Sequence, residues 1–185
     1  MSLILASASP RRKELLERVT TDFVIKPANI DESVRDLETP EAYVERMAFE
    51  KANHIRQKIK DQVILGCDTI VVDKGRILGK PLTEKVAMET LRSLSGGTHL
   101  VMTGMCVLFP DEAPILQTEI VEVEMFDLTE KDINDYVATK EPLDKAGSYG
   151  IQGQGALLVK KIKGDYYSVM GLPIGQLNQL LKERE

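Results

Sequence analysis

The hydrophobic residues of this chain follow two kinds of pattern. In one, apolar residues follow one another or alternate with polar ones, which predicts buried or half-buried strands. In the other, apolar residues recur every three or four positions, which predicts amphipathic helices. Strands are predicted at residues 3–6, 23–26, 63–65, 70–72, 98–109, 115–128, 156–164 and 166–171, and helices at 10–18, 40–61, 83–95, 129–140 and 172–184.

Capping and turn residues support these boundaries. Ser9 and Thr39 each precede a proline, and a hydroxyl cap followed by proline is typical of a first helical turn. Thr129 with Asp132 three residues on resembles a capping box. The turn "DKGR" predicts a hairpin that returns residues 77–78 antiparallel. Long antiparallel strands mixed with helices predict an α/β fold with a mixed, curved sheet flanked by helices.

Composition narrows the class of protein. The 185 residues suit a single domain over 1–185, and 43% apolar with 29% charged residues is typical of a globular protein. A net charge of −5 argues against a broad nucleic-acid-binding face, although a few local cations can still hold phosphates. We expect no membrane span and no signal peptide. Cys67 and Cys106 lie in apolar runs without a metal-binding spacing, which predicts buried reduced thiols and a cytoplasmic protein.

A carboxylate interrupts the apolar run "VILGCDTIVV". Burying an unpaired carboxylate is costly, so Asp68 should face a cleft, a cation or a metal. Gly66 beside it permits close backbone approach. We interpret Asp68 as a general base or as a magnesium ligand, because carboxylate oxygen suits that metal. The alternative is a turn-forming aspartate between two short strands.

Two adjacent arginines occupy the start of the first predicted helix. Arg11 and Arg12 add positive charge where the helix dipole is already positive, which is unfavourable unless an anion faces them. After a strand and a small-residue turn, they stand where phosphates dock on a helix N-terminus. The alternative is a solvated basic helix start.

Other charged residues extend this chemistry. Lys80 follows a predicted strand, Lys51 lies on the long helix next to an apolar position, and Glu32 lies in a polar loop. Each alone is consistent with an ordinary surface residue. Together they supply two cations and one more carboxylate, as metal-assisted phosphate chemistry requires.

The stretch "DKAGSYGIQGQG" is rich in glycine. Its backbone N–H groups can approach a ligand, and the amide of Gln152 can both donate to and accept from the edge of a base. The alternative is a structural glycine-rich turn. On physical grounds alone, these features indicate an enzyme that acts on a phosphorylated small molecule.

The motifs "LASASPRRKELL", "GCDTIVV", "GKPLT", "LSGGTH", "EPLDKAGSYGIQGQGA" and "GDYYSVMGLP" resemble the Maf family of nucleoside triphosphate pyrophosphatases. The resemblance covers nearly the whole chain in the same order. It implies a fold related to inosine triphosphatase, with two lobes around a deep cleft, and a homodimer. It also implies hydrolysis of the α–β phosphoanhydride of a nucleoside triphosphate, with Mg²⁺ or Mn²⁺.

The resemblance also implies residue roles. It makes Asp68 the proton acceptor and places Glu32 near the metal. Phosphate binding falls to Ser7, Arg11, Arg12, Lys51 and Lys80, and substrate choice to Arg11, Thr69 and Gln152. A sister branch that prefers 7-methyl-GTP has a bulky aromatic residue at position 11 and lacks "GIQG". The chain therefore resembles the branch that prefers dTTP and UTP.

Two other readings stay open. Family members are associated with inhibition of septum formation, so the chain is alternatively a non-catalytic nucleotide- or nucleic-acid-binding regulator of cell division. A nearer rival is an enzyme that removes modified pyrimidine nucleotides. The acidic charge balance argues against nucleic acid as the main ligand.

Overall fold

A computed structural model describes residues 2–184. Its seven-stranded mixed sheet has the order β2-β1-β3-β5-β6-β7, and β4 pairs with β3 outside this path. β1 pairs parallel with both β2 and β3, whereas β3 with β4 and β6 with β7 pair antiparallel. The strands are β1 (Leu3–Leu5), β2 (Phe23–Ile25), β3 (Val63–Asp73), β4 (Arg76–Leu78), β5 (Thr98–Leu108), β6 (Ile115–Met125) and β7 (Val159–Lys163).

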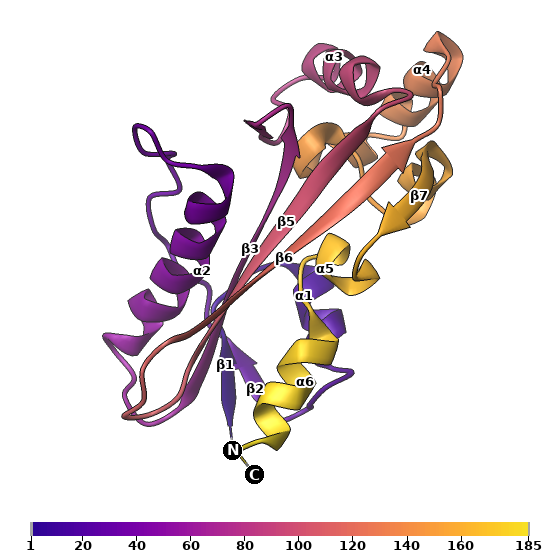
Figure 1. The fold of residues 1–185 in the computed structure, drawn as a ribbon. Helices are drawn as coiled ribbons and strands as arrows, with labels where there is room; N and C mark the ends of the chain where they lie inside the picture. The colour runs from indigo at the N-terminus through magenta and orange to yellow at the C-terminus, as the bar shows by residue number, and fades with distance from the viewer. Residues whose placement is uncertain (1, 185) are drawn as a thin grey trace. The chain divides into compact units, whose positions relative to one another are not determined.

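Six α-helices and three short 3-10 helices lie within the described residues (Figure 1). The α-helices are α1 (Pro10–Leu16), α2 (Pro40–Arg56), α3 (Glu84–Leu94), α4 (Glu130–Ala138), α5 (Tyr166–Met170) and α6 (Ile174–Lys182). The 3-10 helices η1 (Glu141–Asp144), η2 (Ala146–Ser148) and η3 (Gly153–Leu158) occupy most of the glycine-rich stretch. The predicted mixed α/β sheet flanked by helices is confirmed.

The predicted caps are present. The hydroxyls of Ser9, Thr39 and Thr83 accept hydrogen bonds from the backbone of the first turns of α1, α2 and α3. At α4, Thr129 and Asp132 form a capping box, so an aspartate does the work of the usual glutamate or glutamine.

One predicted strand is wrong, and two other predicted elements are shorter in the structure. Residues 166–171 are not a strand, because the Asp165 carboxylate accepts a hydrogen bond from the backbone N–H of Ser168 at 2.7 Å and starts helix α5. That N-cap outweighs the strand preference of two tyrosines and a valine. Residues 156–158 belong to η3, so the predicted strand 156–164 shrinks to β7. The long helix also ends earlier than predicted, at Arg56.

The chain divides into two compact units. Unit 1 comprises residues 1–69, 103–119 and 171–185, and unit 2 comprises residues 70–102 and 120–170. The boundaries fall inside β3, β5 and β6. The single domain over 1–185 and the deep cleft between lobes stay predictions.

In unit 1, helix α2 packs unusually close to the sheet. A Cβ added to Gly66 on β3 would lie 2.2 Å from the carbonyl oxygen of Ala48, and one on Gly104 of β5 would lie 2.5 Å from that of Val44. Only glycine permits this approach. The core beneath α2 includes Ile4, Ala6, Ala48, Ala52, Ile55, Ile64, Cys106 and Leu108.

Unit 2 has its own hydrophobic core. Residues of β5, β6, α3 and α4 build it, and Tyr149 and Leu158 join it from the chain around the glycine-rich stretch. Both cysteines of the protein lie in unit 1, buried and free, as predicted. Burial raises the pKa of Cys67 to about 11 and that of Cys106 to about 12, which keeps both thiols protonated near neutral pH. No helix within residues 2–184 is both long enough and apolar enough to cross a bilayer.

Candidate active site

Asp68 lies in the middle of a continuous strand, which rules out the turn-forming alternative. β3 runs from Val63 to Asp73, whereas its parallel partner β1 stops at Leu5, opposite Leu65. Asp68 is therefore three residues beyond the last pair that β1 makes. Asp68 is 8% exposed. Its side chain faces α2, because side chains two residues apart share one face of a strand and position 66 faces α2.

A lysine and a second carboxylate meet Asp68. Lys51 Nζ lies 2.6 Å from Asp68 Oδ1 and 2.8 Å from Glu32 Oε1. The Lys51 side chain is 10% exposed, and it reaches β3 because Gly66 lets α2 come close. Two carboxylates thus converge on one buried ammonium, which compensates buried Lys51 and Asp68 for their lost hydration, while the Glu32 side chain stays 57% exposed.

The loop that carries Glu32 is fastened to α2. The hydroxyl of Tyr43 donates to the backbone carbonyl of Glu32 at 2.8 Å, and Arg46 donates to the carbonyl of Ser33 at 3.0 Å. Arg46 also forms a two-pronged ion pair with Glu38, whose pKa this pairing lowers to about 2. Burial, with the charges of Asp68 and Glu32, raises the pKa of Tyr43 to about 12, so its hydroxyl stays protonated.

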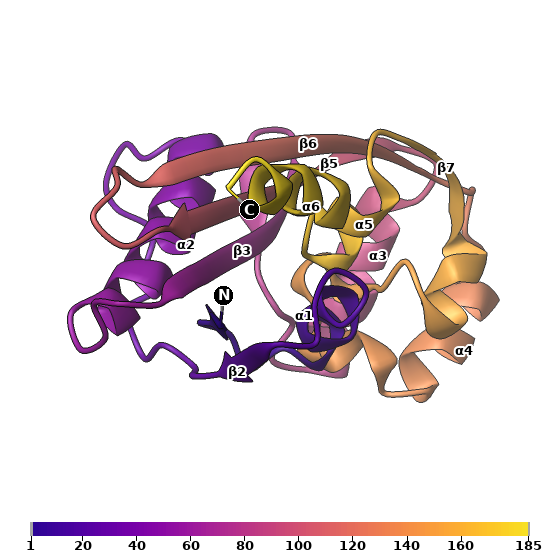
Figure 2. The same cartoon turned by 90° about the horizontal axis from the view of Figure 1, so that it is seen from below.

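Arg12 lies on the opposite face of β3. Thr69, one residue after Asp68, points to the other side of the strand, where its hydroxyl accepts from Arg12 Nη2 at 3.0 Å. Arg12 also donates to the carbonyl of Gly171 at 2.9 Å and to the hydroxyl of Ser7 at 3.3 Å. In Figures 1 and 2, α1 and α2 flank β3 from opposite sides.

A buried threonine supports this arginine. Thr103 on β5 is fully buried, and its hydroxyl lies 3.0 Å from that of Thr69. The Thr69 hydroxyl thus accepts from Arg12 and shares a second hydrogen bond with Thr103, in which either hydroxyl can donate. Three of the five N–H donors of Arg12 have these partners, which leaves two for a ligand.

Arg11 differs from its neighbour. It is half-buried, and its side chain makes no hydrogen bond or ion pair with residues 2–184. Ser7, in contrast, is 8% exposed and accepts from the backbone N–H of Ser9 at 3.2 Å, so its hydroxyl proton is available to a ligand.

The donor set fits a divalent cation bound together with a ligand. The oxygens of Asp68 and Glu32 already surround one cationic atom, Lys51 Nζ. No cluster of three or more metal-binding side chains exists within the described residues. Mg²⁺ is usually held by one or two carboxylates together with substrate phosphates and waters, so two carboxylates are sufficient.

Lys80 and Gln152 belong to unit 2. Lys80 is exposed and follows β4, two residues after Leu78, which pairs with Val71 of β3. Gln152 is half-buried, and its amide makes no hydrogen bond with residues 2–184. Their membership of one site with Asp68 stays a prediction.

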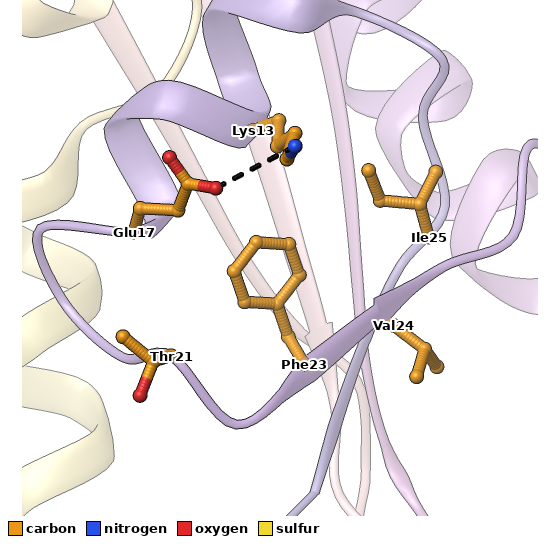
Figure 3. A pocket seen from close by; sticks show the side chains of 6 residues that line it. All are labelled: Lys13, Glu17, Thr21, Phe23, Val24 and Ile25. Carbon is orange, nitrogen blue, oxygen red and sulfur yellow. Dashed lines mark ion pairs between the residues drawn. The ribbon is translucent and has the colours of Figure 1, made fainter.

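A hollow of about 480 Å³ lies elsewhere in unit 1. Lys13, Glu17, Thr21, Phe23, Val24 and Ile25 line it. Figure 3 shows that the Lys13 ammonium and the Glu17 carboxylate are paired above the ring of Phe23, at 3.7 Å. Its one cation is therefore already neutralised, and none of the predicted site residues lines it, so we do not assign phosphate binding to it.

Three residues that support the site were not identified from the sequence. Tyr43, Arg46 and Thr103 hold site residues in place, yet they look like ordinary core or surface residues. The one available signal was the spacing of Tyr43, Arg46 and Lys51, which puts them on one side of α2.

Comparison with known proteins identifies the family. The family described as Maf-like protein matches residues 2–184. A dTTP/UTP pyrophosphatase of Bacillus cereus (strain B4264) is 48% identical over 181 residues, which cover 98% of this chain and 94% of that protein.

Two solved structures share the fold. A HAM1 protein from Coxiella burnetii gives a TM-score of 0.55 at 18% identity and covers 99% of both chains. The Staphylococcus aureus Ham1 protein gives 0.58 at 14% identity and covers 100% of both. At such low identity, these two matches establish the fold alone.

Proposed function

This chain belongs to the Maf family, and from that premise we propose that it hydrolyses dTTP and UTP to the nucleoside monophosphate and pyrophosphate. The observation that carries the proposal is the contact of buried Lys51 with buried Asp68 and with the more exposed Glu32, one residue along β3 from the Arg12–Thr69 pair. The printed name of the 48% identical relative supports the choice of nucleotides.

In the proposed reaction, Arg11, Arg12, Lys51 and Lys80 neutralise the triphosphate. Water attacks in line at the α-phosphorus of the α–β anhydride. A new P–O bond forms, the bridging P–O bond breaks, and pyrophosphate leaves. Asp68 orients the water and accepts its proton, and its ion pair with Lys51 fixes the position of the carboxylate.

Lys51 and Arg12 are placed for phosphate binding. Two of the three N–H donors of Lys51 face Glu32 and Asp68, which leaves one for a phosphate oxygen. Arg12 retains two donors, and the hydroxyl of Ser7 adds a third. Because these donors are fixed before the ligand arrives, little reorganisation is required of them.

Asp68 and Glu32 are the residues that would hold Mg²⁺ or Mn²⁺. Such a cation supplies charge neutralisation and polarises phosphate oxygens. We assign base recognition to Gln152, whose amide can pair with the edge of a pyrimidine, and to Thr69. A wrong base would leave these groups unpaired, which is the physical source of discrimination.

The test is a nucleotide panel. The protein is incubated with Mg²⁺ or Mn²⁺ and UTP, dTTP, CTP, GTP or ATP, and pyrophosphate release is measured. We expect the highest kcat/KM for UTP and dTTP. Release from no nucleotide, together with measurable nucleotide binding, would favour the non-catalytic regulator of cell division instead.

The same panel tests the nearer rival. Adding 5-methyl-UTP, pseudo-UTP and 5-methyl-CTP asks whether modified pyrimidine nucleotides are the better substrates. A kcat/KM above that for UTP and dTTP would reassign the enzyme to their removal.

We further propose a cytoplasmic homodimer that binds no nucleic acid. The two free buried thiols support a reducing compartment, and the net charge of −5 disfavours nucleic acid. Sedimentation of the purified protein tests the dimer.

A further inference from the structure

The loop that carries Gln152 closes on itself. A Cβ added to Gly155 would lie 2.3 Å from the carbonyl oxygen of Gly150, so the two ends of residues 150–155 are in van der Waals contact. Gln152 lies between these ends. The position of its amide therefore depends on whatever holds the two ends together.

A tyrosine and a glutamate bind both ends. The hydroxyl of Tyr136 accepts from the backbone N–H of Gly150 at 3.2 Å and donates to Glu141 Oε1 at 3.0 Å. The same carboxylate accepts from the N–H of Gln154 at 3.0 Å and of Gly155 at 3.2 Å. Four hydrogen bonds thus connect Tyr136 and Glu141 to each other and to both ends of the loop.

The pair is itself anchored. Tyr136 lies on α4 and is 4% exposed, and burial raises its pKa, so the phenol keeps the proton that it donates. The backbone carbonyl of Glu141 accepts from Lys145 Nζ at 2.7 Å. The backbone N–H of Glu141 donates to the Thr139 hydroxyl at 3.1 Å.

The loop backbone is shaped to fit the carboxylate. Gly153 has φ +65°, and a Cβ there would lie 2.7 Å from Glu141 Oε2. A side chain at this position would therefore be strained by its backbone angle and would collide with the Glu141 carboxylate. We call the pair Tyr136 and Glu141 the clamp.

We propose that Glu141 and Tyr136 are positioning residues that set base selectivity by holding loop 150–155, and with it Gln152, in one conformation. This inference rests on the proposed function. A fixed Gln152 amide discriminates between a matching and a non-matching base edge, whereas a mobile one adapts to both.

Glu141→Gln tests the hydrogen bonds of the clamp directly, because it keeps the size of the side chain and replaces one acceptor oxygen with a donor. In either orientation the new NH₂ group meets an N–H or O–H donor. Tyr136→Phe keeps the ring and removes the hydroxyl that bonds to Gly150 and Glu141. The control is Glu130→Gln on α4, whose carboxylate is 62% exposed and pairs with Arg92 alone among the described residues.

The experiment measures kcat and KM for UTP and CTP with each variant. We expect the ratio of kcat/KM for UTP over CTP to fall about tenfold in Glu141→Gln and about fivefold in Tyr136→Phe, as the loss of one or two hydrogen bonds implies. The kcat for UTP should stay within about threefold, because Asp68, the proposed proton acceptor, lies in unit 1 and none of the clamp's hydrogen bonds involves it. Glu130→Gln should match the wild type within about twofold.

Hydrogen exchange without nucleotide gives a second readout that needs no substrate. The amides of residues 150–155 should exchange at least about tenfold faster in Glu141→Gln than in the wild type. Unchanged exchange of these amides would overturn the proposal that the clamp holds the loop. Faster exchange with an unchanged UTP over CTP ratio would overturn its role in base choice. A wild type that hydrolyses neither UTP nor dTTP would refute the proposed function instead. If Glu141→Gln does not fold, Tyr136→Phe decides the question by the same two measurements.

Discussion

The surroundings of Asp68 and the loop around Gln152 are built in opposite ways. Around Asp68 the contacting groups are charged side chains, and most of them stand on a long helix and a long strand. At residues 150–155 the contacts are backbone amides, held by one carboxylate and one phenol. The first region depends on how closely regular elements pack, and the second on a few hydrogen bonds within irregular chain.

This difference predicts two kinds of failure. A change near Asp68 leaves buried charges unpaired or separates α2 from β3, so it should abolish turnover or unfold the protein. A change near Gln152 loosens a few hydrogen bonds, each worth at most about 3 kcal/mol even where the acceptor is the Glu141 carboxylate, so it should alter preference while the fold persists.

The largest effect should come from Asp68→Asn. We expect kcat to fall at least about 1,000-fold, because the proton acceptor is lost, while nucleotide binding is kept. Pyrophosphate release measures the first quantity and titration calorimetry the second. The matched control is Asp73→Asn on the same strand, where 9% exposure resembles the 8% of Asp68, and its kcat should stay within about threefold. Near-normal hydrolysis by Asp68→Asn would remove that residue from catalysis.

Gly66→Ala tests the packing that underlies the first region. The new Cβ would meet the Ala48 carbonyl oxygen at 2.2 Å, so α2 must move away from β3 and carry Lys51 with it. We expect a loss of about 3 kcal/mol in the free energy of unfolding, measured with urea. Gly175→Ala on α6 has nothing within 4 Å and should not destabilise the protein. Equal stability of the two variants would show that the approach of α2 is not tight.

The pH dependence of stability tests the buried His99–Tyr149 pair, which belongs to the same unit as residues 150–155. Buried His99 bonds through Nε2 to the Tyr149 hydroxyl at 2.7 Å, and its Nδ1 has no partner within residues 2–184. Burial lowers the pKa of His99 to about 4, although nearby Asp73 raises it. Between pH 6.5 and 4 the unfolded chain therefore binds the proton first, so stability is lost as the pH falls through that window.

The expected loss is up to about 3 kcal/mol. Urea unfolding of the wild type and of His99→Gln at pH 6.5 and 4 measures it. The variant should lose less stability than the wild type over that interval. Equal losses would mean that His99 is protonated in the folded protein as easily as in the unfolded one.

The smallest effect should follow Thr103→Val. It removes the partner of the Thr69 hydroxyl and loosens Arg12 through it. We expect the KM for UTP to rise about fivefold with little change in kcat, and Thr103→Ser to restore it. Steady-state kinetics decide this, and a serine variant as poor as valine would point to packing rather than hydrogen bonding.

Sequence alone located the first region better than the second. Asp68 attracts notice because a carboxylate in an apolar run needs a partner, and hydroxyl caps with proline mark α1 and α2. The sequence also indicated a ligand near Gln152, from the glycines around it. Glu141 begins a motif that resembles the family, yet neither it nor Tyr136 was given a role, because a glutamate after a helix and a tyrosine in a core pattern are ordinary.

The errors have a physical reason of the same kind. Residues 166–171 look like a strand by composition, and only the side chain of Asp165 makes them helical. Partners that lie far apart in sequence, such as Thr69 and Thr103, cannot be paired from spacing. Local patterns predict elements, whereas contacts between elements require the fold.

The boundaries inside β3, β5 and β6 limit how the protein can be dissected. Each half is assembled from separate stretches of chain, so no single cut liberates either one intact. A deletion that removes one half must also shorten strands of the other and expose their apolar ends. Expression of fragments would therefore report on aggregation rather than on function, and the contributions of the halves are best separated by single substitutions in the whole chain.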